Sequence, residues 1–460
     1  MGNPHVLVVP YPAEGHIIPL LELSKRLVKQ GFSVTFVSTE HVHQKVKDLI
    51  TKSTNDNDSE SEVHVAVVED GLSFEDRKRP GKLSESVLRV MPGKVDELVD
   101  HINGDNQTVV ISCLVADQSL GWALDMAERR GIKRAAFCPA AAAMLAQAFS
   151  IPKLIDEGII NKDGTLTKKQ MMIKLSPEMP GMNTSNLVWA SLGNADMQRN
   201  VFQLMLKNYT SVKKTDWLLC NSTYDLEPAA FNLLAPQALP IGPLLSTNSS
   251  TTATTKNCLK WLDQFPPKSV IYIAFGSSTA LDPTQFMELA SGLELSNRPF
   301  LWVVRRTHNM YSENFPEGYI DGFLDRVLAS NYKGIVVEWA PQQEVLRHPS
   351  VGCFVSHCGW NSTVEGVSSG VPFLCWPNCF ADQFVNQSYV CEVWGVGLGL
   401  ERDENGVVSR EEIRRKVERV MGDEEMIGKA LELKEMAHHC VKEGGTSANN
   451  FKAFVGWIKS

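Results

Sequence analysis

Short apolar runs alternate along the chain with longer segments whose apolar residues recur every three or four positions. In the first half, such runs predict β-strands at 5–9, 33–37, 63–67 and 108–113. A helix-length segment follows each run, and in the first, about 16–29, Leu20, Leu23 and Leu27 fall on one face. Strands that are apolar almost throughout, separated by helices, are typical of a parallel sheet that is covered on both faces.

The second half repeats this alternation. Its apolar runs predict strands at 270–275, 300–304, 335–338, 351–355 and 373–375. With 460 residues, the chain is also longer than the roughly 250–300 residues that one hydrophobic core usually serves. No repeat with a period of about 20–50 residues is visible, which argues against a solenoid. The sequence therefore predicts an α/β fold with two parallel-sheet domains.

The domain boundary is expected at STNSSTTATT, residues 246–255, which has no large apolar residue and no periodicity. Such a composition is typical of a flexible surface linker. We therefore expect a first domain over 1–245, a linker over 246–256 and a second domain over 257–445. A last helix is expected over 446–460, where Phe451, Phe454 and Trp457 fall three apart, so one face must be buried.

Composition and charge exclude several classes of protein. Hydrophobic residues make up 43% and charged residues 21%, which is too apolar for a disordered chain. The net charge of −8 gives no field that attracts phosphate backbones or anionic membranes, so nucleic acid is a poor candidate partner. The ten cysteines form no C-x-x-C pair, no basic leader precedes the first strand, and no apolar stretch reaches about 20 residues. We expect a reduced, cytoplasmic protein without a membrane span, in which the Asn-X-Ser/Thr triplets at Asn106, Asn208 and Asn361 are unmodified.

Three short motifs have a plain interpretation. The polar stretch 51–62 contains Asp56 and Asp58 in the D-x-D pattern of metal-dependent sugar transferases, but its biased composition favours a solvated loop. The run 438–440, His-His-Cys, has no second ligand pair at metal spacing, which favours a solvated helix face over zinc. GVGLGL at 395–400 has no helix directly after it, so a short strand is favoured over a dinucleotide site. We expect no metal site.

The most informative segment begins with WAPQQEV and ends with CFADQ. Within it, GCFVS predicts a buried strand and HCGWNSTVEG predicts a tight turn into a helix. At the carboxyl end of a parallel strand, such a turn aims the backbone amides of the next helix at a site for an anion. Gly359 allows close approach, Asn361 and Ser362 add polar groups, and His357 is placed to donate. A capping box from Ser362 to Glu365 explains the same pattern, and this segment alone does not distinguish an anion site from an ordinary helix start.

The flanks of this segment favour a nucleotide. Trp339 and Gln342 present an aromatic face and an amide at a strand exit, which suits a base such as uracil, with stacking worth about 1–3 kcal/mol. The ordered set WAPQ, His348, HCGWNS, Glu365, GVP and the terminal Asp-Gln pair resembles the donor-binding signature of the plant UDP-dependent glycosyltransferases of family 1.

The resemblance extends over nearly the whole chain. PYPAEGHIIPL is similar to the segment in which a Gly-His pair carries the catalytic base, here His16, and CLVADQSLGWAL to the one that bears its acidic partner, here Asp117. The loop with Ser277 and Thr279 is similar to the phosphate-side loop of the second domain. The last helix resembles one that packs back on the first domain. The resemblance implies the GT-B fold, in which two Rossmann-like domains face each other across a cleft that holds the active site.

A mechanism is also implied by the resemblance. It is an inverting transfer from a UDP-α-sugar to an acceptor hydroxyl, with no metal ion or other cofactor. A hydroxyl is a weak nucleophile, so a base must take its proton. Histidine is suited because its unperturbed pKa of about 6.5 leaves it mostly neutral at cytosolic pH. Asp117, against the far ring nitrogen of His16, would fix the tautomer and stabilise the imidazolium that develops.

The donor contacts are likewise carried over from the resemblance. Trp339, Ala340 and Gln342 are assigned to uracil and Glu365 to the ribose hydroxyls. The diphosphate side is assigned to Ser277, Thr279, His357, Gly359, Asn361 and Ser362. The sugar is assigned to Trp360, Asp382 and Gln383. A Gln at the end of the signature usually accompanies glucose, so glucose is the expected sugar.

Two departures from the family pattern affect the site. Four residues, 378–381, stand between Pro377 and Asp382 where the family has three, so we expect a bulge where sugar and acceptor meet. The family's Gln before the Gly-His pair is Glu14 here. This second carboxylate either raises the pKa of the base or points away from it, and the sequence leaves both open.

The candidate acceptor contacts are Gln118, Ser119, Ala141, Met144 and Phe380, together with the segment 179–189. Their Ala-, Met- and Trp-rich composition predicts an apolar pocket, which suits a phenolic, flavonoid or terpenoid acceptor. Residues 140–144 fit a plain buried helix equally well.

Two other functions were weighed. An NAD-type oxidoreductase on paired Rossmann-like domains is disfavoured because no strand ends in a G-x-G-x-x-G that opens a helix. A non-catalytic UDP-sugar-binding or ligand-binding protein on the same scaffold would have no need of both His16 and Asp117. We expect a monomeric enzyme that acts on two small molecules, and the sequence does not fix the acceptor or the position that is glycosylated.

Overall fold

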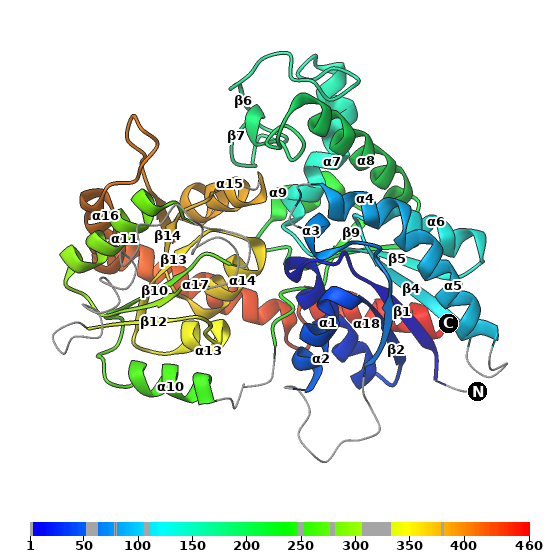
Figure 1. Cartoon of the computed structure of the whole chain (residues 1–460), viewed down its shortest axis with the longest axis horizontal. Coiled ribbons are helices and arrows are strands. Elements are labelled where there is room, and N and C mark those ends of the chain that lie inside the picture. The colour runs from blue at the N-terminus through cyan, green and yellow to red at the C-terminus, as the bar shows by residue number, and fades with distance from the viewer. Residues whose placement is uncertain are drawn as a thin grey trace. The chain divides into compact units, whose positions relative to one another are not determined.

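The chain folds into two α/β units (Figure 1). The computed structural model describes residues 3–51, 63–77, 79, 81–104, 110–246, 253–276, 281–305, 333–378 and 381–460. Unit 1 comprises 1–248 together with 439–460, and unit 2 comprises 249–438. Each unit contains a parallel sheet accompanied by helices, so the predicted α/β class with two parallel-sheet domains is confirmed.

Unit 1 is built on a seven-stranded sheet in the order β3-β2-β1-β4-β5-β8-β9, and every neighbouring pair runs parallel. Its strands are β1 (His5–Val9), β2 (Ser33–Thr39), β3 (His64–Val68), β4 (Ile111–Asp117), β5 (Lys133–Cys138), β8 (Trp217–Cys220) and β9 (Ala238–Pro240). Its helices include α1 (Glu14–Lys29), α2 (Glu40–Thr51), α3 (Phe74–Arg77), α4 (Lys82–Arg89), α5 (Met91–Gly104), α6 (Gly121–Arg129), α7 (Ala142–Asp156), α8 (Ala195–Lys213), α9 (Pro228–Leu234) and α18 (Thr446–Lys459). A small hairpin pairs β6 (Met172–Ile173) with β7 (Met182–Asn183), which a single 3₁₀ turn follows (Thr184–Asn186).

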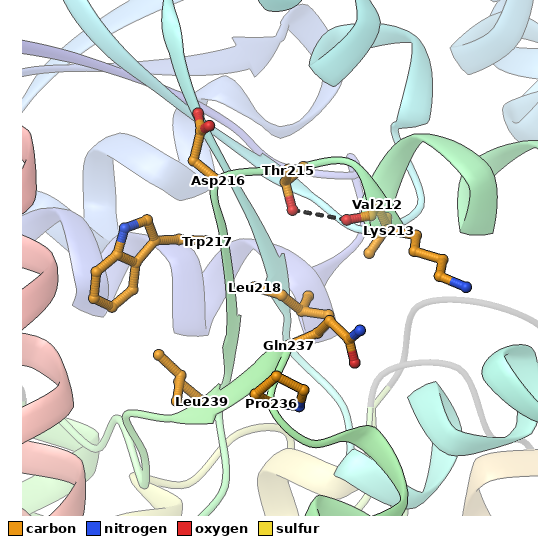
Figure 2. Close-up of a pocket in the computed structure, with 9 residues that line it drawn as sticks. All are labelled: Val212, Lys213, Thr215, Asp216, Trp217, Leu218, Pro236, Gln237 and Leu239. Carbon is orange, nitrogen blue, oxygen red and sulfur yellow. Dashed lines mark hydrogen bonds between the residues drawn. The ribbon is translucent and has the colours of Figure 1, made fainter.

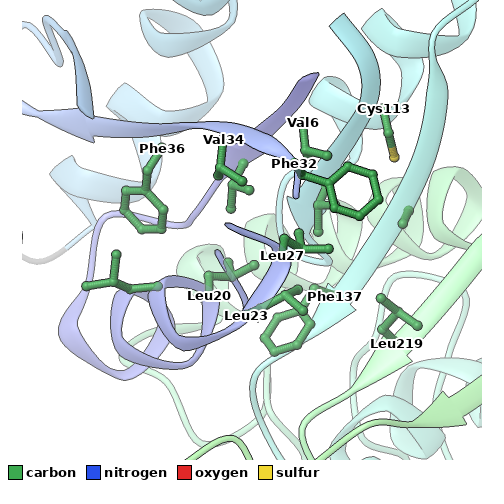
Figure 3. Packing of buried hydrophobic residues seen from close by; sticks show 14 of the residues in the cluster. Val6, Leu20, Leu23, Leu27, Phe32, Val34, Phe36, Cys113, Phe137 and Leu219 are labelled. Carbon is green, nitrogen blue, oxygen red and sulfur yellow. The ribbon is translucent and has the colours of Figure 1, made fainter. Parts of the chain in front are cut away.

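Helix α1 packs against one face of this sheet (Figure 3). Leu20, Leu23 and Leu27 are fully buried in one cluster with Val6 and Phe36 of the neighbouring strands. The three leucines share one face because they recur at three- and four-residue spacing, as the sequence predicted. Burying each of them contributes about 1.5–3 kcal/mol, which holds α1 against the sheet.

The last helix, α18, belongs to unit 1 although it ends the chain. Phe454 is buried in the same cluster as α1. The Lys133 ammonium donates to the carbonyl of Trp457 at 2.8 Å, and the Asn450 amide donates to the carbonyl of Pro240 at 2.9 Å. Apolar packing and these two bonds therefore attach α18 to β5 and β9.

Unit 2 has a six-stranded parallel sheet in the order β12-β11-β10-β13-β14-β15. Its strands are β10 (Val270–Ala274), β11 (Phe300–Val303), β12 (Gly334–Val337), β13 (Val351–Ser356), β14 (Phe373–Cys375) and β15 (Gly397–Gly399). Its helices include α10 (Ala253–Leu262), α11 (Pro283–Ser296), α13 (Gln342–Arg347), α14 (Trp360–Ser369), α15 (Ala381–Ser388), α16 (Arg410–Gly422) and α17 (Glu424–Val441), and a π-helical turn (Tyr389–Val393) continues α15. Phe286 stacks on Trp302 with ring centroids 4.7 Å apart in a buried cluster between α11 and the sheet.

The predicted strands that the structure describes are all present, with ends that move by a few residues. The short strand predicted within 395–400 is β15. Strands β5, β8 and β9 were not predicted from the sequence, and residues 253–256, expected in a linker, open α10. Residues 247–252 of the expected linker and the D-x-D motif at Asp56 and Asp58 lie outside the described residues.

Candidate active site

Two neighbouring strands of unit 1 bring His16 and Asp117 together. β1 and β4 run parallel, with Val9 beside Ala116, so the residues that follow them meet at the same edge of the sheet. Asp117 ends β4, and His16 lies in the first turn of α1. The Nδ1 atom of His16 is 2.7 Å from Oδ2 of Asp117. The predicted base and its acidic partner are therefore in direct contact.

The two members of this pair differ in burial. The Asp117 side chain is fully buried, while that of His16 is 33% exposed. An ionised carboxylate only accepts hydrogen bonds, so Asp117 holds the proton of the neutral imidazole on Nδ1. The lone pair of that imidazole then lies on Nε2, the nitrogen on the side away from Asp117.

Tyr11 is a neighbour of the pair that the sequence analysis did not single out. Its ring centroid lies 5.1 Å from that of His16, and its hydroxyl lies 3.1 Å from Oγ of Ser84 in α4. Burial, with a smaller contribution from the charge of Asp117, raises the pKa of Tyr11, so the phenol stays neutral beside the imidazole. Its place in PYPAEGH, five residues before His16, was the available signal.

Glu14, which stands where the family has Gln before the Gly-His pair, forms an ion pair with Lys45 of α2. The two side chains are 27% and 43% exposed, respectively. The ammonium of Lys45 compensates the charge of Glu14. Of the two possibilities left open by the sequence, the structure therefore favours a carboxylate that is engaged elsewhere.

The turn after Asp117 carries two candidate acceptor contacts. The amide of Ser119 donates to Oδ1 of Asp117 at 2.9 Å, and the amide of Gln118 donates to the carbonyl of Phe137 at 2.9 Å. The side-chain oxygen of Gln118 is buried and has no hydrogen-bond partner among the described residues. An unpartnered buried acceptor one residue from Asp117 is a feature expected of a ligand site.

The other acceptor candidates are less accessible. Ala141 is fully buried and Met144 is 8% exposed, and α7 begins between them at Ala142. A buried helix start therefore describes 140–144 better than an open pocket wall does. Gln147 of the same helix is also buried, and its side-chain oxygen accepts from the amide of Val188 at 3.4 Å, which ties α7 to the segment 179–189. Phe380 lies outside the described residues.

In unit 2, Trp339 follows β12 and is 39% exposed. Ala340, next to it, is 7% exposed. A partly exposed tryptophan at a strand exit is suited to stacking against a flat base.

Gln342 and Glu365 form one polar network. The Gln342 amide donates to Oε2 of Glu365 at 2.6 Å and to Oγ of Ser362 at 2.9 Å. Two residues that sequence reasoning missed complete it: Gln343 donates to the other Glu365 oxygen at 3.0 Å, and the hydroxyl of Tyr272 donates to Oε1 of Gln342 at 3.2 Å. Burial raises the pKa of Glu365, and the two amide donors oppose that shift. The network therefore holds the carboxyl group in one orientation.

His357 is packed between two glycines. A Cβ atom on Gly276 would lie 2.6 Å from its Nε2, and one on Gly359 would lie 2.5 Å from the same atom, so neither position admits a side chain without displacing the ring. The backbone of Ala274 bonds to the imidazole, whereas its buried Nδ1 has no partner in the described part of the chain. Asn386 of α15 was not singled out from the sequence. Its side-chain amide donates to the carbonyl of Cys358 at 2.8 Å and supports the turn between β13 and α14.

The N-cap residue of α14 is a glycine, which makes no side-chain capping bond. The helix begins at Trp360, with Gly359 as its N-cap, and Ser362 lies inside the first turn. The alternative of a capping box from Ser362 to Glu365 is therefore wrong, because both side chains bond to Gln342. Asn361 is partly exposed and Trp360 is 4% exposed. An uncapped helix start after a buried strand has the geometry of an anion site.

Asp382 and Gln383 lie in the first turn of α15. Gln383 is 3% exposed, and its side-chain oxygen accepts from the amide of Asn378 at 2.8 Å, across the stretch with the additional residue. Asp382 is partly exposed. Residues 379–380 of that stretch, and the phosphate-side candidates Ser277 and Thr279, lie outside the described residues.

The buried imidazole of His357 is expected to make the stability of the fold sensitive to acid. Burial lowers its pKa from 6.5 to about 4, so it is neutral at neutral pH. Between these values the unfolded chain binds the proton and the folded chain does not, so stability is lost as pH falls from about 6.5 to about 4. The gap corresponds to about 3 kcal/mol. We measure the free energy of unfolding by urea titration at pH 7 and at pH 4.5. Between these two pH values, His357→Gln should lose less stability than the wild type does. An equal loss in both proteins would contradict this.

His348, also part of the signature, has a different role. Its Nδ1 lies 2.8 Å from Oγ of Ser350 and its Nε2 lies 3.1 Å from Oδ1 of Asp263. With both ring nitrogens engaged, it holds the start of β13 against the residue that follows α10.

Within the described ranges, no group of three or more His, Cys, Asp or Glu side chains is placed to hold a metal ion. The solvated face expected at 438–440 is wrong for Cys440, which is buried with its thiol 3.0 Å from Oδ2 of Asp225. None of the helices that the structure describes is long and apolar enough to cross a membrane.

A hollow of about 350 Å³ lies elsewhere on unit 1 (Figure 2). Trp217 at the start of β8, Gln237 just before β9 and Lys213 at the end of α8 are among the residues that line it. The strands run parallel, so their amino ends lie at the edge opposite to Asp117. This hollow is therefore separate from the His16–Asp117 pair.

Comparison with known sequences gives a match over almost the entire chain. The family model described as UDP-glucoronosyl and UDP-glucosyl transferase matches residues 4–441. UDP-glycosyltransferase 83A1 of Arabidopsis thaliana is 47% identical over 473 residues, which cover 100% of this chain and 98% of that protein.

Solved structures give the same picture for the fold. A UDP-glucosyltransferase from Polygonum tinctorium, capable of glucosylating indoxyl, superposes with a TM-score of 0.83 and 28% identity, covering 100% of this chain and 99% of its own. UGT71G1 of Medicago truncatula, complexed with UDP-glucose, superposes with a TM-score of 0.81 and 26% identity, covering 100% and 99%.

Proposed function

Because the chain belongs to the UDP-glucoronosyl and UDP-glucosyl transferase family and is a UDP-glycosyltransferase of the GT-B class, we propose that it transfers glucose from UDP-α-glucose to a hydroxyl of a small lipophilic acceptor, with inversion at the anomeric carbon. The observation that carries this proposal is the 2.7 Å contact between partly exposed His16 and fully buried Asp117. Family membership also argues against the oxidoreductase and binding-protein alternatives.

In the proposed reaction, Nε2 of His16 takes the proton of the acceptor hydroxyl as its oxygen attacks the anomeric carbon. The C–O bond to UDP breaks in the same step, and UDP leaves with the bonding electrons. Asp117 keeps the Nδ1 proton in place and stabilises the imidazolium cation that forms. General base catalysis of this kind contributes roughly 10²–10⁴-fold to the rate.

We assign the donor to unit 2. Trp339 would stack on uracil, Glu365 and Gln342 would receive the ribose hydroxyls, and the start of α14 with His357 would bind the diphosphate. The helix N-terminus supplies partial positive charge for the leaving UDP. We propose that no metal ion takes part and that one chain suffices. Dialysis against EDTA should then leave kcat unchanged, and restoration of a lost rate by Mg²⁺ or Mn²⁺ would contradict this.

Glucose is proposed as the sugar on two grounds. Gln383 ends the signature, as in the family's glucose users, and two similar solved proteins are a UDP-glucosyltransferase and a complex with UDP-glucose. A phenolic, flavonoid or terpenoid acceptor is proposed because the acceptor-side segment 179–189 contains Met, Leu, Val and Trp side chains. The Polygonum protein's reported action on indoxyl, an aromatic hydroxyl compound, agrees with this choice.

The direct test is to mix the protein with UDP-glucose and a panel of phenols, alcohols and carboxylic acids. Released UDP and the mass of each product are then measured. A product heavier by one hexosyl residue supports the proposal. UDP binding without glycoside formation from any acceptor would instead favour a binding protein.

The stacking assignment predicts the effect of removing the indole. Trp339→Ala should weaken UDP binding by about 1–3 kcal/mol, or roughly 5–150-fold in Kd, because the base loses its stacking partner. Trp339→Phe keeps an aromatic face and should lose less. Titration calorimetry with UDP checks both, and an unchanged Kd for Trp339→Ala would remove Trp339 from the donor site.

A further inference from the structure

The turn that carries Asp117 is held by several backbone contacts. Oδ1 of Asp117 accepts from the amide of Ser119 at 2.9 Å, and its carbonyl accepts from the amide of Leu120 at 2.8 Å. The first bond fixes the rotamer of Asp117, which presents its other oxygen, Oδ2, to His16, and the second closes the backbone turn. The orientation of the dyad therefore depends on the conformation of the turn over 117–121.

One side chain from a distant helix closes this turn. Asn208 of α8 donates from Nδ2 to the carbonyl of Ser119 at 2.8 Å, and its Oδ1 accepts from the amide of Gly121 at 3.1 Å. The backbones approach closely there, since a Cβ atom on Gly121 would lie 2.8 Å from Oδ1 and 3.0 Å from Cα of Asn208. A single amide thus bonds to both ends of the stretch 119–121.

We propose that Asn208 is a positioning residue for the His16–Asp117 dyad. This inference rests on the proposed function, in which Asp117 orients the base. Asn208 holds the carbonyl of Ser119, the amide of Ser119 holds Oδ1 of Asp117, and Oδ2 of Asp117 holds the imidazole. Without Asn208 the turn gains freedom, and the dyad spends less time in the reactive geometry.

The chemistry of the site requires an amide. The turn presents one acceptor and one donor to α8, and an amide side chain complements both. Asp at 208 would still accept from Gly121 but would set an oxygen against the carbonyl of Ser119. The same contact agrees with the expectation that the triplet Asn208-Tyr209-Thr210 carries no glycan, because the side-chain nitrogen that a glycan would modify donates to the backbone carbonyl of Ser119.

The experiment compares Asn208→Ala and Asn208→Asp with Asn200→Ala, an exposed position on the same helix. We measure kcat, KM for UDP-glucose, Kd for UDP and the melting temperature. Both Asn208 variants should lose about 10–100-fold in kcat with unchanged Kd for UDP, whereas Asn200→Ala stays at wild-type values. Asn208→Asp keeps the volume of the side chain, so a role in packing alone predicts near-wild-type kcat for it.

A double-mutant cycle with Asp117→Ala makes the test specific. In that background, Asn208→Ala should cause no further loss of kcat, because the group it positions is absent. A further 10–100-fold loss, or equal losses of kcat and UDP binding in both Asn208 variants, would overturn the inference. Full activity of Asn208→Ala beside inactive Asp117→Ala would overturn this inference alone. Full activity of Asp117→Ala would overturn the proposed function as well.

Discussion

Replacing His16 by Ala is expected to lower kcat about 10²–10⁴-fold, because no other group then takes the proton of the acceptor hydroxyl. The affinity for UDP should remain at the wild-type value, since the residues proposed to bind the donor belong to unit 2 and His16 belongs to unit 1. UDP release measured at saturating acceptor gives kcat, and calorimetry gives Kd for UDP. The variant thus separates catalysis from donor binding.

Two further variants make this prediction specific. His64→Ala removes an exposed imidazole from β3 and should keep wild-type kcat. Asp117→Asn retains the shape of the dyad but disturbs the tautomer, and it should also lose at least about 10²-fold in kcat. Because the two residues act as a unit, the double variant should be little slower than His16→Ala. Near-wild-type kcat for His16→Ala would contradict the assigned base.

The second large effect concerns stability and the start of α7. Glu227 is fully buried, and its carboxylate accepts from the amides of Ala142 and Ala143 at 2.8 and 2.9 Å and from the hydroxyl of Ser222 at 2.6 Å. It caps α7 from 85 positions away, because the N-cap, Ala141, has no polar side chain. Glu227→Ala leaves two buried helix amides without an acceptor, at about 1–3 kcal/mol each.

We therefore expect Glu227→Ala to lower the free energy of unfolding by about 3–5 kcal/mol. Urea titration followed by tryptophan fluorescence gives the change. Glu227→Gln keeps the volume and one acceptor oxygen and should lose less than Glu227→Ala. Glu178→Ala, at an exposed position, should change stability by no more than about 0.5 kcal/mol. A similarly small loss for Glu227→Ala would show that α7 does not need this cap.

Much of the fold was predictable because buried parallel strands are continuous apolar runs. The runs that became β1, β10 and β13 carry no charged residue in their apolar stretch, so both their pattern and their composition indicate a buried strand. β5 was missed because it opens with Lys133 and Arg134. These two side chains find partners in the carbonyl of Trp457 and in Glu128, contacts that only the folded chain provides.

The residues of the candidate site likewise fall into those that the sequence predicts and those that it does not. His16, Asp117 and Trp339 were predictable because each stands in a local motif at a strand exit. Asn208 and Glu227 were not, because the backbone groups of Ser119 and Ala142 to which they bond lie more than 80 residues away and nothing near them in sequence marks the contact. Local reasoning also left a capping box from Ser362 to Glu365 open as an alternative, since the residue that bonds both side chains, Gln342, is supplied by another helix.

The proposed mechanism depends on direct attack by an acceptor oxygen that loses its proton to His16. The most direct test is the anomeric configuration of the glucoside formed from UDP-α-glucose, read from the coupling of its anomeric proton in an NMR spectrum. Direct displacement predicts the β-glucoside as the product. An α-glucoside would mean retention of configuration, and it would contradict the single-step transfer proposed for this enzyme.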